Sequence, residues 1–168
     1  GNGCTEDDTT SITINPEPVV TFAAISSLCI DGGSFAVTGG SPVGGMYVGT
    51  GVDSTGNFDP TVAGSGTTTI TYNYTDANNC SSSNTSSVAV FALPNAAAGV
   101  DQTICFGDSV TLTATGGTTY SWSNGAGNAS QSVSPAATTN YGVLVNDVNG
   151  CTNTDSVMVN VNQYCWRR

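Results

Sequence analysis

The chain has 168 residues, of which 8% are charged: 12 are acidic, 2 are basic and none is histidine. Both cations, Arg167 and Arg168, end the chain, so its body cannot neutralise phosphates or anionic lipids, and nucleic-acid binding is not expected. Without histidine and lysine the commonest general base and the Schiff-base amine are missing, and we expect no enzyme.

Apolar and polar residues alternate with a period of two, which predicts β-strands and no amphipathic helix. In chain order the alternating runs are 11–14, 68–75, 87–91, 109–115, 119–123, 140–145 and 156–161. Clusters of Gly, Asn, Asp and Ser separate these runs and indicate turns. The pattern is typical of antiparallel β-sandwiches. No segment approaches 18 consecutive apolar residues, so insertion into a membrane is not expected.

The chain contains an internal repeat. Residues 72–91 and 141–160 share an aromatic strand, an Asp-x-Asn-x-Cys turn and a second strand, and a truncated copy covers residues 2–14. We expect two complete domains, 16–93 and 94–161, followed by a tail, 162–168. Residues 1–15 would be the last strand of a preceding, incomplete repeat or a strand that pairs with another subunit.

Each complete repeat has one early and one late cysteine. The repeat favours one disulfide within each sandwich, Cys29–Cys80 and Cys105–Cys151, although six cysteines allow other pairings. Each bond would close a loop of about 50 residues and contribute about 4 kcal/mol in the chain-entropy model.

Six cysteines in this polar, weakly charged chain indicate an oxidising, extracytoplasmic compartment. Cys4 and Cys165 are left over: either their partners lie outside this sequence, or they form bonds between chains. Zinc is disfavoured because there is no CxxC pair.

One loop is a candidate metal site. Residues 52–60 bring Asp53, Asn57 and Asp59 close together, and calcium prefers such oxygen ligands. The loop lacks the alternating acids and final Glu of a calcium loop, so an ordinary loop is the alternative. We expect no other cofactor. Asp76 and Asp147 are interpreted as turn formers, since Asx side chains cap hairpin turns.

Tyr120 and Trp122 share one face of a predicted strand. We expect them in a sandwich core; a sugar-binding platform would need them exposed.

The second repeat carries five distinctive segments: DQTIC, TLTATGG, YSWSNG, VSPAATTNYGVLV and NGCTNTDSV. Over residues 98–161 they resemble the immunoglobulin-like or PKD-like repeats of large secreted adhesins of Bacteroidota. The first repeat, with CIDGGSFAVTGG, resembles a sister module with a Gly-rich centre. The resemblance implies tandem immunoglobulin-like β-sandwiches, type IX secretion, a cell-surface location and roles in adhesion, gliding or filaments.

The same resemblance implies O-glycans on Ser or Thr after Asp. The candidates are Thr9, Ser54, Ser109 and Ser156. Chance matches in a Ser/Thr-rich chain are the alternative.

These observations together predict a non-catalytic extracellular structural or adhesive module, a rod segment or filament subunit of a bacterial adhesin. A carbohydrate- or calcium-binding accessory module of an exported enzyme is the alternative, and a hydrolase using Asp53 and Asp59 is a third hypothesis. We expect residues 5–15 to add as a strand to a neighbouring chain, so that subunits self-associate into a filament or array. Surface glycans or proteins are the other expected partners.

Overall fold

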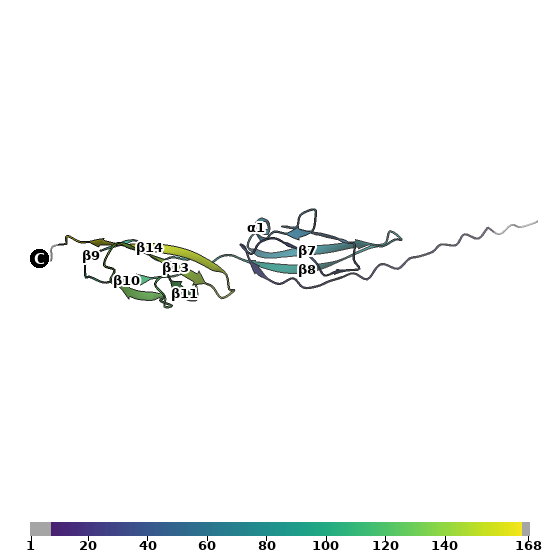
Figure 1. The fold of residues 1–168 in the computed structure, drawn as a ribbon. Helices are drawn as coiled ribbons and strands as arrows, with labels where there is room; N and C mark the ends of the chain where they lie inside the picture. Colours follow the sequence, from purple (N-terminus) through teal and green to yellow (C-terminus); the bar gives the residue numbers. More distant parts are fainter. Residues whose placement is uncertain (1–7, 166–168) are drawn as a thin grey trace, which may run out of the picture.

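The computed structural model describes residues 8–165, and it is an all-β protein with one short helix. Its strands form two elongated bodies that lie end to end (Figure 1). We name the body built from β1–β8 unit 1 and the body built from β9–β14 unit 2. The predicted division between residues 93 and 94 falls in the connection between β8 and β9, outside every strand.

Unit 1 contains eight strands and the helix. They are β1 (Thr21–Phe22), β2 (Leu28–Cys29), β3 (Phe35–Ala36), β4 (Gly40–Ser41), β5 (Met46–Gly49), β6 (Asn57–Phe58), α1 (Pro60–Ala63), β7 (Gly66–Thr75) and β8 (Ser81–Phe91). Unit 2 contains β9 (Gln102–Cys105), β10 (Val110–Thr113), β11 (Thr119–Trp122), β12 (Ser130–Val133), β13 (Thr139–Asn146) and β14 (Thr152–Asn162).

The two units share one topology. The larger sheet has the order β2-β8-β7-β5 in unit 1 and β9-β14-β13-β11 in unit 2, and the smaller sheets pair β3 with β6 and β10 with β12. Unit 1 contains one further sheet, in which β1 pairs with β4. One pair in each large sheet is parallel: β2 with β8 in unit 1 and β9 with β14 in unit 2. All other pairs of the described strands are antiparallel. Two facing, mainly antiparallel sheets with this strand order form an immunoglobulin-like sandwich, as predicted.

Alternation places the apolar side chains in two cores, one per unit. In unit 1, Ile70 on β7 and Val88 and Val90 on β8 are almost fully buried. In unit 2 the same pattern buries Val143 and Val145 on β13. The period of two therefore predicted correctly which face of these long strands packs inward.

The Gly-rich part of unit 1 forms strands that the sequence did not predict. Tyr72 packs against Phe22 and Tyr47, with ring centroids 6.2 Å and 4.7 Å away. Its hydroxyl accepts a hydrogen bond from the Gly45 backbone N–H at 2.7 Å. A Cβ on Gly45 would lie 2.4 Å from the Tyr72 ring, so only glycine lets this backbone approach the aromatic cluster. Short strands of two to four residues, held by such contacts, leave no alternating pattern.

Two further expectations differ from the structure. The alternating run 11–14 forms no strand: Ile12 and Ile14 are 85% and 89% exposed, because the extended segment pairs with no strand within residues 8–165. Helix α1 was not predicted, since four residues are too few to show a helical period. It is set by Pro60 in the first turn and by Asp59, whose carboxylate accepts a hydrogen bond from the Thr61 N–H at 2.8 Å. Within residues 8–165 no helix is long and apolar enough to cross a bilayer.

Candidate functional site

The disulfides contradict the predicted pairing. Cys29 bonds Cys151 and joins the two units, and Cys105 bonds Cys165 at the far end of unit 2. The predicted Cys29–Cys80 and Cys105–Cys151 bonds are therefore wrong, and so is the expectation that Cys165 is unpaired or bonded to another chain. Among the described cysteines Cys80 is left as a free thiol. Cys4 lies outside the described residues.

Strand direction explains why the intradomain pairing fails. Cys29 ends β2 and lies opposite Phe91, the last residue of β8, because these two strands are parallel. Cys80 directly precedes β8, whose 11 residues span about 35 Å. A disulfide needs Cα atoms about 4.4–6.8 Å apart, so Cys29 and Cys80 cannot meet. The same parallel pairing separates Cys105, opposite Asn162, from Cys151 in unit 2.

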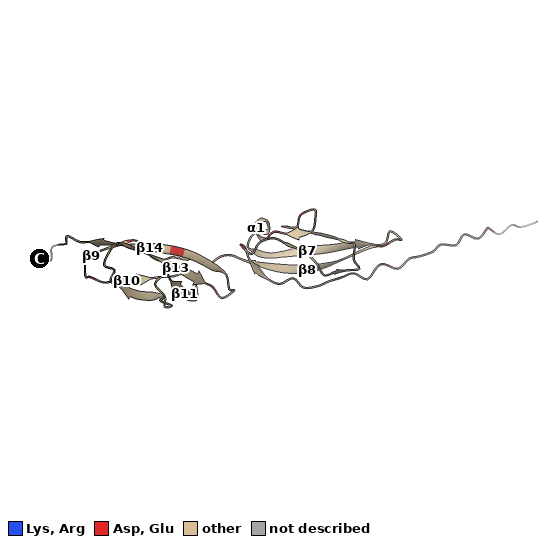
Figure 2. Ribbon diagram, viewed as in Figure 1, with Lys and Arg blue, Asp and Glu red and all other residues tan. Residues whose placement is uncertain are grey.

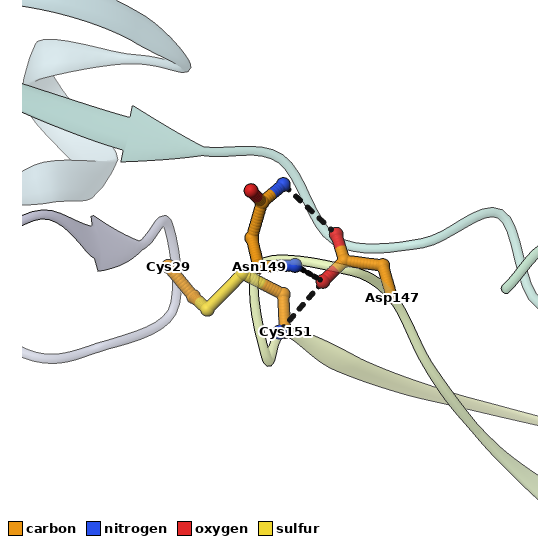
Figure 3. Close-up of a disulfide and its surroundings, with 4 residues drawn as sticks. All are labelled: Cys29, Asp147, Asn149 and Cys151. Carbon is orange, nitrogen blue, oxygen red and sulfur yellow. Dashed lines mark hydrogen bonds between the residues drawn. A yellow bond between two sulfur atoms is a disulfide. The ribbon is translucent and has the colours of Figure 1, made fainter. Parts of the chain in front are cut away.

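The junction between the units is built from a cysteine at a strand end and a cysteine at a hairpin turn. The Cα atoms of Cys29 and Cys151 lie 5.6 Å apart. Figure 3 shows the turn that positions Cys151: one carboxylate oxygen of Asp147 accepts hydrogen bonds from the N–H groups of Asn149 at 2.8 Å and Cys151 at 2.9 Å. Gly150 supplies the positive φ, 82°, that the turn requires. Asp147 thus acts as a turn former, as predicted.

The equivalent turn in unit 1 has the same geometry. Asp76 accepts hydrogen bonds from the N–H groups of Asn78 at 2.8 Å and Cys80 at 2.9 Å, and Asn79 takes the positive φ, 61°. The half-buried Cys80 thiol lies 3.9 Å from the carbonyl oxygen of Asn15, at the end of unit 1 where residues 8–15 leave it. Cys80 therefore occupies at this end the position that Cys151 occupies at the junction.

The proposed calcium ligands line one hollow. Asp53, Asn57 and Asp59 all line it together with Gly51 and Val62, and its volume is about 270 Å³. The hollow lies beside α1, where the β5–β6 connection meets the start of the helix. All three side chains line this hollow, but their role as metal ligands stays a prediction. No cluster of three or more Asp, Glu, His or Cys residues suited to a metal occurs in the described part of the chain.

Hydrogen bonds hold both carboxyl groups of this hollow in their charged form. The Thr55 hydroxyl, followed by the backbone N–H groups of Asn57 and Thr55, lowers the pKa of Asp53 to about 2. The Thr61 hydroxyl and backbone N–H lower the pKa of Asp59. Neither group therefore carries the proton that a general acid would need at neutral pH. This geometry gives no support to the hypothesis of a hydrolase that uses Asp53 and Asp59.

Trp122 belongs to the core cluster of unit 2, and Tyr120 packs against that cluster. Trp122 is 2% exposed, and its indole N–H donates to the Asn128 carbonyl at 2.9 Å. Tyr120 is half-buried, and its hydroxyl donates to the Gly117 carbonyl. The prediction that this pair packs inward is confirmed, so it forms no sugar-binding platform on the surface.

The glycosylation candidates Thr9, Ser54, Ser109 and Ser156 are all exposed. Exposure is what a modifying enzyme needs, but modification itself stays a prediction. The ribbon in Figure 2 carries acidic residues and no basic ones, because Arg167 and Arg168 lie outside the described residues. No Lys or Arg side chain is therefore present within residues 8–165 to form an ion pair.

No protein-family model matches the chain, and no curated protein matches it. Three of the similar solved structures span different organisms. A Ca2+-stabilised adhesin that helps an Antarctic bacterium bind ice is 18% identical, with a TM-score of 0.40 over 88% of this chain and 50% of that one. The insect immune protein hemolin is 15% identical, with a TM-score of 0.39 over 87% and 46%.

The third is SGBP-B of the mixed-linkage glucan utilization locus of Bacteroides ovatus, in complex with a heptasaccharide. It is 16% identical, with a TM-score of 0.32 over 86% of this chain and 48% of that one. The chain thus spans about half the length of all three. At these identities and TM-scores the similarities assign no function, and the immunoglobulin-like fold rests on the strand order described above.

Proposed function

We propose that the chain is a non-catalytic extracellular structural and adhesive module, a rod segment that self-associates into a filament or array. The observation that carries the proposal is the Cys29–Cys151 bond, which joins two sandwiches end to end. A covalent link at this point limits bending between the units, which is useful in a rod. Disulfides persist in oxidising compartments, which supports a location outside the cytoplasm.

The finer parts of this proposal rest on the sequence resemblance. They are export through type IX secretion in Bacteroidota, attachment at the cell surface, and O-glycans on Thr9, Ser54, Ser109 and Ser156. The division into domains 16–93 and 94–161 is also part of the proposal, and it rests on the internal repeat. Surface glycans or proteins are the other proposed partners.

Self-association is supported by the described part of the N-terminal segment. Residues 8–15 are extended and exposed, and Ile12 and Ile14 project their side chains into solvent. An extended segment whose backbone has no strand partner in its own chain is suited to add to a sheet edge of another copy. Alternating isoleucines would supply the apolar face of that added strand.

The test measures mass by light scattering at rising protein concentration and images the same samples by electron microscopy. We expect mass to grow with concentration and elongated assemblies to appear, and Ile12→Asp with Ile14→Asp to shift the growth to at least about tenfold higher concentration, a loss of about 1.4 kcal/mol. Val43→Asp is the matched control, because Val43 is 88% exposed but lies on unit 1. A chain that stays monomeric throughout would overturn the proposal.

Calcium binding at the Asp53 loop is a second candidate, favoured because Asp53, Asn57 and Asp59 all line one hollow. Because a ligand that binds only the folded state stabilises it, calcium chloride should raise the unfolding temperature of the wild-type chain. Asp53→Asn should remove most of that rise, whereas Asp31→Asn, in an exposed turn, should keep it. Equal unfolding temperatures with calcium and with a chelator would contradict this assignment.

A further inference from the structure

The junction between the units defines a rule for joining sandwiches of this kind. A cysteine that ends the first strand of the large sheet, Cys29 on β2, bonds a cysteine that precedes the last strand of the next unit, Cys151 before β14. Both kinds of cysteine occur once more in the described chain. Cys105 ends β9, the strand equivalent to β2, and Cys80 precedes β8, the strand equivalent to β14.

The second strand-end cysteine is held like the first. Cys29 lies opposite the last residue of β8, and the next N–H, that of Ile30, donates to the Phe91 carbonyl at 2.8 Å. Cys105 lies opposite the last residue of β14, and the next N–H, that of Phe106, donates to the Asn162 carbonyl at 3.1 Å. The two cysteines therefore leave their sheets from equivalent backbone positions.

The two halves of this additional junction lie at opposite ends of the molecule. The turn that holds Cys80 is at the end of unit 1 where the N-terminal segment leaves, and Cys105 is at the end of unit 2 near the C-terminus (Figure 1). One copy cannot bring them together, but a second copy in line with the first can. Such a copy would repeat between chains the contact that Cys29 and Cys151 make within one.

A neighbouring apolar side chain supports the same contact. Ile30, which follows Cys29, packs against the core cluster of unit 1, whereas its counterpart Phe106, which follows Cys105, is 58% exposed. A docked unit 1 of another copy would lie over the end of the sandwich that carries Phe106. Covering this ring would remove apolar surface from water and favour the contact.

We propose that copies of this chain join head to tail through a disulfide between Cys80 of one copy and Cys105 of the next. The inference rests on the self-association proposed above and names its covalent contact. The step is a thiol–disulfide exchange: the Cys80 thiolate attacks Cys105 of the Cys105–Cys165 bond, the new bond forms, and Cys165 leaves as a thiolate that takes up a proton. One bond breaks and one forms, so no external oxidant is required.

The Cys105–Cys165 bond then keeps Cys105 from forming a disulfide with another copy. Because both partners belong to one chain, their effective concentration is high, and capture of Cys105 by another copy is favoured only when copies are docked or concentrated. Replacing Cys165 removes this competitor and leaves Cys105 as a free thiol. Oxidised glutathione then forms a mixed disulfide with Cys105, and the Cys80 thiolate of another copy displaces glutathione from it.

The experiment compares variants in a Cys4→Ser background, which prevents bonds through that cysteine. Proteins are incubated in a glutathione redox buffer and separated on non-reducing gels, and linked peptides are identified by mass spectrometry. We expect Cys165→Ser to give a ladder of covalent multimers whose main linkage is Cys80–Cys105. Adding Cys80→Ser or Cys105→Ser should remove the ladder, and Phe106→Asp should slow its growth.

Random collisions predict a different product. They would give Cys80–Cys80 and Cys105–Cys105 bonds that together are as frequent as the mixed bond, and that result would overturn the inference. So would a chain that remains unlinked although Cys80 reacts readily with a small thiol reagent. Light scattering of the same samples separates the two proposals: assembly without a Cys80–Cys105 bond leaves the proposed function standing and overturns only the disulfide link.

Discussion

At the residue scale, carboxylates in this protein bind backbone N–H groups, since residues 8–165 contain no basic side chains. Asp76 and Asp147 hold the two equivalent hairpin turns in this way, and Asp53 holds its loop. Asp155 connects β14 to the segment that leads into β9. Its carboxylate accepts a hydrogen bond of 2.8 Å from the backbone N–H of Ala98, which lies in that segment. Hydrogen bonds to ionised acceptors are stronger than those to neutral ones, so these few charges contribute to the fold.

Asp155 gives a prediction about pH. The Ala98 N–H, followed by that of Ser156, lowers the pKa of Asp155 below its usual value of 3.8. Its stabilising effect is therefore present above about pH 4 and is lost as the pH falls through the lowered pKa. Asp155→Asn should reduce the free energy of unfolding at neutral pH by about 1 kcal/mol, a modest value because the group is exposed.

Urea unfolding at neutral pH and at about pH 2 checks this prediction, because protonation of the wild-type carboxyl group should shrink the difference between the two proteins. Asp31→Asn, in an exposed turn, is the control for a general loss of negative charge. A difference that is the same at both pH values would show that the N–H bond to Asp155 does not depend on its charge.

At the element scale, the two long hairpins, β7–β8 and β13–β14, organise each unit. Their antiparallel register runs from Gly66↔Val90 to Thr75↔Ser81 in unit 1 and from Thr139↔Val159 to Asn146↔Thr152 in unit 2. Each hairpin turn lies at one end of its sandwich. The strand that runs parallel to the hairpin's last strand, β2 in unit 1 and β9 in unit 2, ends at the opposite end of the sandwich. Every unit thus presents one cysteine position at each end, which is what an in-line connection between units requires.

At the scale of the whole molecule, the Cys29–Cys151 bond should control how freely the units bend. Cys29→Ser with Cys151→Ser removes the bond, whose partners are 122 residues apart in sequence, and leaves the connection between β8 and β9 as the covalent link. Small-angle X-ray scattering should then show a broader distribution of shapes, and a protease should cut this connection faster.

The matched control for that prediction is Cys105→Ser with Cys165→Ser, which opens a disulfide confined to one end of unit 2. This variant should lower the stability of unit 2 but leave the scattering profile near that of the wild type. Identical profiles for all three proteins would mean that the connection alone holds the units in line and that the Cys29–Cys151 bond adds no stiffness.

Much of the sheet structure was predictable because burial acts locally on alternating side chains. Val88, Val143 and Val157 lie on the apolar side of the alternating runs 87–91, 140–145 and 156–161, and all three are buried. The Gly-rich strands around Tyr72 were not, since contacts between distant segments define them. The grouping of Asp53, Asn57 and Asp59 was predictable because the three lie within one loop.

The amino-acid sequence by itself determined the fold class, the repeat and the presence of turns at Asp76 and Asp147, because all three depend on residues close together in the chain. The tertiary structure alone decided which cysteines bond. Sequence spacing records the phase of a repeat but not the direction of its strands. Because β2 runs parallel to β8, Cys29 lies at the opposite end of its unit from Cys80 and bonds Cys151 of the neighbouring unit instead.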